Sequence, residues 1–350
     1  MLQILILFVF SWLLQDNEPP QFPYWDRVPD NEITWHPNGN HLAIATSHGL
    51  WVYNLQNDEA SLISDCGRAT FTPMFNHEGD HLAYNTNEPV VRLVDWITQT
   101  EMTQFHIFGN TVQSMVFDRE RSQLVVASGY SSEYGVSESK IEVWDYQKHE
   151  VLLTMDVRRW VISHMQVDVD TDVLWVTAAE LGLDVTHTYL WAVEMQSGNV
   201  ILNFPMQLAD ANGVRMDNAV FVYSTTDNMQ EAYRFLIWNS KGIYNRILET
   251  PYDSSIYRFD ITNSSERVAM ITQDNRLRVM PLYQRRHDLY DLDVQLDNIR
   301  VQSVRFDPTG ERLAIQLSGE LPEVEIWDME TMTHSMTLRT ADWYQADCGG

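Results

Sequence analysis

The chain has 350 residues, of which 44% are hydrophobic and 11% aromatic, and its 49 acidic and 23 basic residues give a formal charge of −26. This hydrophobic content excludes a disordered chain. The charge argues against nucleic acids and anionic membranes as partners, because both are bound through Lys and Arg. Basic proteins, cations and neutral ligands are compatible with it.

The N-terminal residues 1–15 read MLQILILFVFSWLLQ, an apolar run that has the length of a signal-peptide core and is shorter than a membrane-spanning helix. The run lacks preceding basic residues and a small-x-small cleavage site. It is therefore either an export signal, which would make the protein extracytoplasmic or secreted, or an N-terminal surface helix of a cytoplasmic protein. No membrane association beyond this segment is expected. Residues 16–32 are predicted to be a linker or a closing strand.

Residues 33–57 read ITWHPNGNHLAIATSHGLWVYNLQN and contain three alternating apolar runs. The runs are separated by Asn38-Gly39-Asn40 and by Ser47-His48-Gly49, and a fourth run, SLIS, follows at residues 61–64. A two-residue apolar period between turn residues is typical of antiparallel strands. This segment is therefore predicted to be a four-stranded antiparallel unit.

The same pattern recurs six more times at a mean step of about 46 residues, close to the period of four-stranded propeller blades. The sequence therefore predicts an all-β protein, a seven-bladed β-propeller of four-stranded antiparallel blades, over residues 33–340, with a tail at 341–350. The last blade takes its fourth strand from residues 332–340, or residues 23–28 lie beside that blade and close the ring. The third strands align Tyr53, Val94, Trp144, Ala192, Trp238, Met280 and Trp327.

The segments HPNGNHLAIAT and DPTGERLAIQLS, and third strands that end in Trp144-Asp145 and Trp327-Asp328, resemble bacterial WD-repeat propellers. The resemblance covers residues 33–340, and among related propellers the blades are most similar to the degenerate blades of the Tol-Pal periplasmic type. No blade begins with the Gly-His pair of that family, and the closing Trp-Asp is intact in blades 3 and 7 alone. The resemblance implies a protein-binding scaffold whose blades are held mainly by apolar packing.

No catalytic or cofactor motif appears in the sequence. Nucleophile elbows, Gly-rich phosphate loops and zinc-binding helices are absent, so neither an enzyme nor a bound cofactor is predicted. Cys66 and Cys348 lack metal-ligand spacing, and whether they pair is left open. No metal site is predicted either: His36, His41, His77 and His81 occupy equivalent turns of blades 1 and 2, where solvated turn residues are the simpler interpretation.

The loops between second and third strands differ in length between blades. Blades 1, 2 and 6 have short turns, whereas blades 3, 4 and 5 carry residues 129–139, 180–187 and 226–233. Because these blades are neighbours, the long loops are predicted to crowd one sector of one face. Loops on a rigid scaffold commonly carry binding residues, and this aromatic and acidic composition suits a basic or amine-bearing protein. The predicted binding residues are Tyr130, Glu133, Tyr134, Asp184, His187, Asp227, Met229 and Glu231.

Arg215, Arg258 and Arg305 recur at one position of the innermost strands of blades 5 to 7. Three arginines around a central channel could hold an anion, although ion pairs with neighbouring carboxylates are the simpler interpretation. The sequence thus favours a monomeric, non-enzymatic WD-repeat-type scaffold that docks a protein on one face. The alternative is a propeller-type enzyme or a small-anion binder that uses the channel.

Overall fold

The computed structural model describes residues 32–64, 70–132, 135–158, 160–168, 171–180, 187–206, 215–217, 220–226, 232–239, 244–251, 256–264, 266–272, 274–281, 290–296, 300–319 and 321–347. Within these ranges, residues 131–137, 163, 180–188, 204–257 and 345–347 are described by their backbone alone. The N-terminal segments 1–15 and 16–31, Cys66, Cys348 and the proposed closing strand at 23–28 lie outside the described residues.

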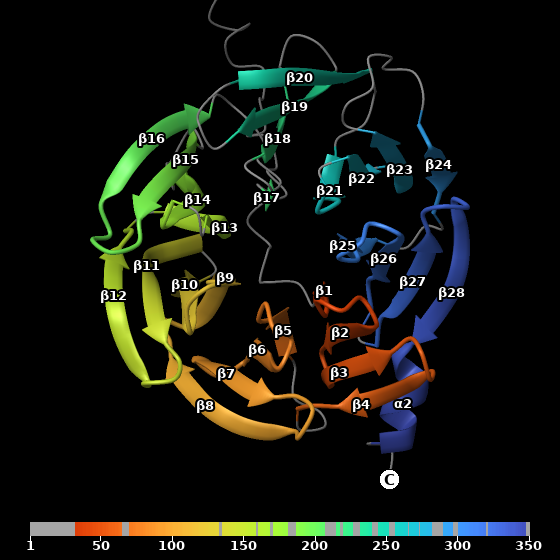
Figure 1. The fold of residues 1–350 in the computed structure, drawn as a ribbon, viewed down its shortest axis with the longest axis horizontal. Coiled ribbons are helices and arrows are strands. Elements are labelled where there is room, and N and C mark those ends of the chain that lie inside the picture. Colours follow the sequence, from red (N-terminus) through yellow and green to blue (C-terminus); the bar gives the residue numbers. More distant parts are fainter. Residues whose placement is uncertain are drawn as a thin grey trace, which may run out of the picture.

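The described strands form seven four-stranded antiparallel sheets, each in chain order. Figure 1 shows the sheets as blades around a central axis, with the first strand of each blade innermost and the fourth outermost. The prediction of a seven-bladed all-β propeller is confirmed. Within the described part of the chain, no helix is long and apolar enough to cross a membrane.

Blades 1 to 4 come from the first half of the chain. Blade 1 comprises β1 (Ile33–Trp35), β2 (His41–Thr46), β3 (Gly49–Asn54) and β4 (Glu59–Leu62). Blade 2 comprises β5 (Thr70–Phe75), β6 (His81–Thr86), β7 (Val90–Asp95) and β8 (Thr100–His106). Blade 3 comprises β9 (Thr111–Phe117), β10 (Gln123–Ser132), β11 (Gly135–Asp145) and β12 (Glu150–Asp156). Blade 4 comprises β13 (Trp160–Asp168), β14 (Val173–Glu180), β15 (His187–Glu194) and β16 (Val200–Met206).

Blades 5 to 7 complete the ring. Blade 5 comprises β17 (Arg215–Asp217), β18 (Val220–Thr226), β19 (Ala232–Asn239) and β20 (Tyr244–Pro251). Blade 6 comprises β21 (Ile256–Ile261), β22 (Arg267–Thr272), β23 (Arg276–Pro281) and β24 (Leu292–Gln295). Blade 7 comprises β25 (Val301–Phe306), β26 (Arg312–Leu317), β27 (Glu323–Asp328) and β28 (Thr333–Arg339), and helix α2 (Thr340–Asp347) follows it.

The core lies between the blades. In β2, β6, β22 and β26, five of six side chains are buried, because each second strand is covered on both faces by neighbouring blades. The outer strands are mostly exposed, as in β8. The loops between second and third strands and the links between blades lie on one face, here called the link face. The other turns lie on the opposite face, called the turn face.

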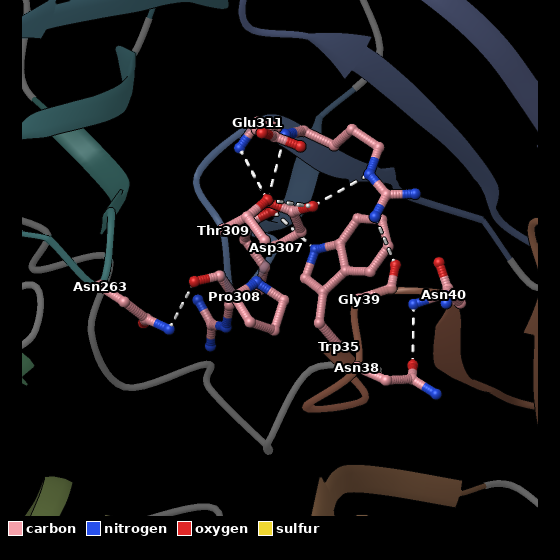
Figure 2. Close-up of polar contacts among 11 residues, drawn as sticks. Trp35, Asn38, Gly39, Asn40, Asn263, Asp307, Pro308, Thr309 and Glu311 are labelled. Carbon is pink, nitrogen blue, oxygen red and sulfur yellow. Dashed lines mark hydrogen bonds and ion pairs between the residues drawn. The ribbon is translucent and has the colours of Figure 1, made fainter.

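In blades 2, 6 and 7, the polar residue just after the innermost strand holds the turn that follows. The Asp307 carboxylate accepts hydrogen bonds from the backbone N–H of Glu311 at 2.9 Å and of Arg312 at 3.2 Å (Figure 2). Asn76 and Thr262 accept equivalent bonds in blades 2 and 6. Such side-chain acceptors replace strand partners that the turning backbone lacks. The polar residues that the sequence places in these turns are therefore there for the same reason in several blades: each accepts hydrogen bonds from the backbone of its turn.

The third and fourth strands of five blades share a β-bulge at one position. In blades 2, 3, 5 and 7 the third-strand residue at the bulge is Val94, Trp144, Trp238 and Trp327 respectively, as the sequence alignment predicts. In blade 4 it is Val193, and the predicted Ala192 lies one place away, opposite Trp175. The alignment was wrong there because a run of consecutive apolar residues does not define which face each one takes.

Side-chain contacts join the first and last blades. The predicted fourth strand at 332–340 is confirmed as β28, so every described strand of blade 7 comes from the C-terminal part of the chain. Gln316 donates its Nε2–H to the backbone oxygen of Ala45 at 3.0 Å, and Trp35 donates its Nε1–H to that of Arg305 at 3.1 Å. Apolar residues of both blades form one buried cluster, including Ile44 and Ile326.

Residues 341–350, which the sequence indicated to be a tail, contain most of helix α2. Trp343 stacks on Tyr53 of blade 1 with ring centroids 5.3 Å apart, and Tyr344 contacts His48 at 4.9 Å. Thr340 fixes the start of the helix by donating to the backbone oxygen of Pro322 at 2.7 Å. The helix therefore bridges blades 7 and 1, beside β4 and β28 in Figure 1. The sequence did not reveal it because so short a segment shows no apolar period.

Candidate functional site

The long loop predicted in blade 3 is an extension of its hairpin. Strands β10 and β11 remain paired as far as Ser131 with Val136 and Ser132 with Gly135. The register shifts between Gly129 and Ser131, which places Tyr130 at an irregularity of the strand. Tyr130 is thus carried on a paired strand, and a strand positions a side chain more rigidly than a loop does. Glu133 and Tyr134, at the tip, lie outside the described residues.

Tyr130 is 49% exposed and is the one exposed Phe, Tyr or Trp among the described side chains. Its ring meets Phe108 edge to face, with centroids 5.2 Å apart. Phe108 belongs to the link between blades 2 and 3, and the Lys140 ammonium lies 4.4 Å from its ring centroid. Lys140 also pairs with Asp156 at 3.6 Å. We call Phe108, Tyr130 and Lys140 the aromatic platform.

Two glycines allow the link and the hairpin to meet under this platform. Gly109 has φ +84°, and a Cβ there would lie 2.3 Å from the carbonyl of Gly129. A Cβ on Gly129 would lie 2.4 Å from the backbone oxygen of Glu138. Asn110 donates its backbone N–H to Gly129 at 3.0 Å, which joins the two segments. The platform is therefore built on backbone contacts that a larger residue would break.

Glu142 lies below the platform on β11. Burial raises the pKa of its carboxyl group, whereas nearby Lys140 and a hydrogen bond from the Phe108 backbone act in the opposite direction. Its Oε2 atom is buried and has no hydrogen-bond partner among the described residues. The site thus combines an exposed aromatic ring, one cation and several carboxylates, with Glu138 exposed nearby. Such a set can bind a cation or a polar chain.

The structure describes little of the predicted sector beyond blade 3. His187 begins β15, where its backbone pairs with Glu180. Asp184, Asp227, Met229 and Glu231 lie outside the described residues. Whether the long loops of blades 3 to 5 form one surface therefore stays a prediction.

Two of the predicted channel arginines can be followed. Arg258 donates its Nε–H to the backbone oxygen of Gln302 at 2.6 Å. Arg305 donates to the backbone oxygen of Val304 at 3.0 Å and lies 3.7 Å from the Glu32 carboxylate. Both are on innermost strands, as predicted, and Arg215 is too, although its side chain is not described. The guanidinium groups thus contact neighbouring protein groups, and the Glu32 carboxylate would disfavour an anion beside Arg305.

His36 and His41 of blade 1 belong to a packed aromatic cluster with Phe75 and Trp96 of blade 2. His36 is buried, with its Nε2 2.7 Å from the Gly79 backbone oxygen and its Nδ1 accepting from the Asn38 N–H at 3.0 Å. Both ring nitrogens are therefore occupied. Among the described residues, no three His, Cys, Asp or Glu side chains gather in a group that could hold a metal ion.

No family model matches the chain, and neither does any curated protein. Solved structures do share its fold. One is a chain in a crystal structure of a mitotic checkpoint complex, with a TM-score of 0.65 and 16% identity over 87% of this chain and 90% of that one. At this identity the likeness concerns the fold alone. Together with the seven sheets, it identifies the protein as an all-β propeller.

Proposed function

We propose that this propeller is a non-enzymatic binding scaffold, and that a partner protein docks on its link face around the aromatic platform. The observation that carries the proposal is Tyr130, an exposed ring held in place by Phe108. Exposed, preorganised tyrosines are common anchors of protein interfaces, because they bury a large area at a small loss of conformational entropy.

The chemistry around Tyr130 favours a partner segment that carries a cation. Lys140 already lies against Phe108, so the ring of Tyr130 is the aromatic surface that an incoming group would meet. Glu138 and Asp156 lie near it, and the whole chain carries a charge of −26. A partner Lys or Arg would gain a cation–π contact and long-range attraction. The propeller fold, which this chain shares with a chain from a multiprotein complex, is compatible with such a role.

Site-specific photo-crosslinking tests the proposal. A photoreactive phenylalanine at position 130, in cells that make the protein, should give a crosslinked product of one defined partner. The same group at Ile97, an exposed residue on the turn face, serves as the control. With the partner purified, Tyr130→Ala should weaken binding by at least about tenfold and Tyr130→Phe much less. Equal crosslinking from both positions, or unchanged binding by Tyr130→Ala, would refute it.

A further inference from the structure

Gln113 lies at a bulge of β9, the innermost strand of blade 3. Ser114 pairs with Ala127 of β10, and Val112 pairs with the next residue, Ser128. Gln113, between them, therefore has no cross-strand partner. An extra residue of this kind departs from the regular alternation of the strand and re-aims its side chain. The side chain of Gln113 is thus available to groups that its own strand does not pair with.

The side-chain amide of Gln113 joins two neighbouring blades. It donates its Nε2–H to the Ser139 hydroxyl at 2.9 Å, and its Oε1 accepts from the backbone N–H of Ile162 at 2.8 Å. Ser139 belongs to β11 of the same blade, whereas Ile162 belongs to β13, the innermost strand of blade 4 (Figure 1). Ser139 and Ile162 are each 1% exposed. We call these two hydrogen bonds of Gln113 the amide bridge.

The amide bridge lies against the part of the hairpin that carries Tyr130. Ser139 pairs with Gly129, the residue before Tyr130, and the register shifts immediately after this pair. A Cβ on Gly129 would lie 2.8 Å from the Ser139 Oγ and 2.9 Å from the Gln113 Nε2, so the hairpin backbone packs directly on the bridge. The backbone oxygen of Ser139 also accepts from the N–H of Val157, in the link to blade 4, at 3.0 Å. The last regular pair before Tyr130 is therefore held to the neighbouring blade at two points.

Blade 7 has the same amino acid at the equivalent bulge without such a bridge. Val301 pairs with Leu317 and Ser303 with Gln316, which leaves Gln302 as the extra residue of β25. The Gln302 backbone oxygen accepts from Arg258 of blade 6. Its side-chain Oε1, however, is buried and has no hydrogen-bond partner among the described residues. A glutamine at this bulge therefore does not by itself create the bridge, which depends on the hairpin and strand around Gln113.

We propose that Gln113 is a positioning residue of the docking site, and that the amide bridge fixes the direction of Tyr130 by tying its hairpin to blade 4. Without the amide, the buried Ser139 hydroxyl and the Ile162 N–H lose their partner, and the hairpin shifts to satisfy them. A side chain held from below presents one geometry to an incoming partner, which reduces the entropy lost on binding. The docking role of Gln113 rests on the proposed function, whereas the bridge is a property of the free protein.

Fluorine NMR of the full chain with 4-trifluoromethyl-phenylalanine at position 130 tests the bridge without a partner. The otherwise unchanged chain should give one narrow resonance, and Gln113→Leu should broaden or split it. Hydrogen exchange over residues 160–168 should rise at least about tenfold in Gln113→Leu, while exchange in β26 stays unchanged and shows an intact fold. Gln113→Glu should keep the resonance, because its carboxylate accepts from both the Ile162 N–H and the Ser139 hydroxyl. Gln302→Leu, at the equivalent bulge of blade 7, is the matched control and should also keep it.

Binding of the partner captured by crosslinking at position 130 tests the docking role. Gln113→Leu should weaken this binding by at least about tenfold, mainly through faster dissociation. Gln113→Glu should stay within about threefold of the unchanged chain, and Gln302→Leu within about twofold.

The two measurements separate the ways in which the proposal can fail. An unchanged resonance in Gln113→Leu overturns it, as do equal effects of Gln113→Leu and Gln302→Leu. A changed resonance with unchanged binding overturns the positioning role, while docking at Tyr130 stands. If Tyr130→Ala also binds normally, the proposed function fails, and the fluorine spectrum of the free protein distinguishes that failure from a failure of the amide bridge.

Discussion

Arg312 of the last blade donates its Nη2–H to the backbone oxygen of Gly39 in the first blade at 2.6 Å, across 273 positions of sequence. The same guanidinium donates its Nε–H to the Asp307 carboxylate at 3.0 Å. Its central carbon, Cζ, lies over the ring of Trp35, 5.2 Å from the ring centroid. Figure 2 shows this contact between the turns of the two blades. The Asp307 side chain is fully buried. One side chain therefore both neutralises a buried carboxylate and joins the ends of the ring.

Arg312→Met should lower the free energy of unfolding by about 2–3 kcal/mol, because it leaves the buried Asp307 carboxylate without its cation. Urea unfolding measures the change. Arg339→Met is the matched control: Arg339 is 64% exposed and pairs with Glu323, and losing such a surface pair should cost less than about 1 kcal/mol. Equal effects of the two substitutions would contradict a role of Arg312 in ring closure.

Trp343→Ala should lower the free energy of unfolding by about 1–2 kcal/mol, because it removes the stacked ring that attaches helix α2 to Tyr53. Asp342→Ala, at an exposed position of the same helix, should change it by less than about 0.5 kcal/mol. Thermal and urea unfolding measure both. If Trp343→Ala is as mild as its control, the helix does not stabilise the junction of blades 7 and 1.

Burial lowers the pKa of His41, and the neighbouring His36 lowers it further. The folded protein therefore binds fewer protons here than the unfolded chain, whose histidine titrates near 6.5. The contribution of His41 to the free energy of unfolding is complete above pH 6.5 and is lost as the pH falls below that value. His41→Gln should make the free energy of unfolding depend less on pH between 7.5 and 5. His334→Gln, at an exposed position, is the control.

Glu142 changes the pH dependence of stability in the opposite direction to His41. Its pKa is raised by burial, so its charged form is disfavoured in the folded state and its contribution to stability falls as the pH rises above 4.5. Glu142→Gln should therefore raise the free energy of unfolding at pH 7, and the gain should disappear below pH 4.5. Glu330→Gln, at an exposed position, is the control. A loss of stability at pH 7 would mean that the Glu142 charge is stabilising, through Lys140 or another partner.

Much of the fold could be read from local chemistry. The turns at Asn38-Gly39 and Pro308-Thr309-Gly310 are visible because polar and glycine residues are needed there, and the alternating runs between them mark strands. Both features repeat, so the number of blades and strands follows from counting. The candidate site was predicted in part: Tyr130 was singled out by its place in a long segment between strands. Its partner Phe108 was missed, because a lone aromatic in a short link carries no pattern.

By itself the sequence determined the class of fold, the seven blades and their four strands, because these depend on turn residues and on apolar alternation within a few positions. Only the tertiary structure decided how the ring closes and which side chains face outward. Arg312 meets Gly39, and Trp343 meets Tyr53, through contacts between distant segments. The register shifts that leave Met102, Leu152 and Ile201 without a direct cross-strand partner arise when two strands pair. A register shift of one residue turns a side chain to the opposite face of the sheet. Such a shift is a property of two paired strands, so it cannot be read from the sequence of either strand alone.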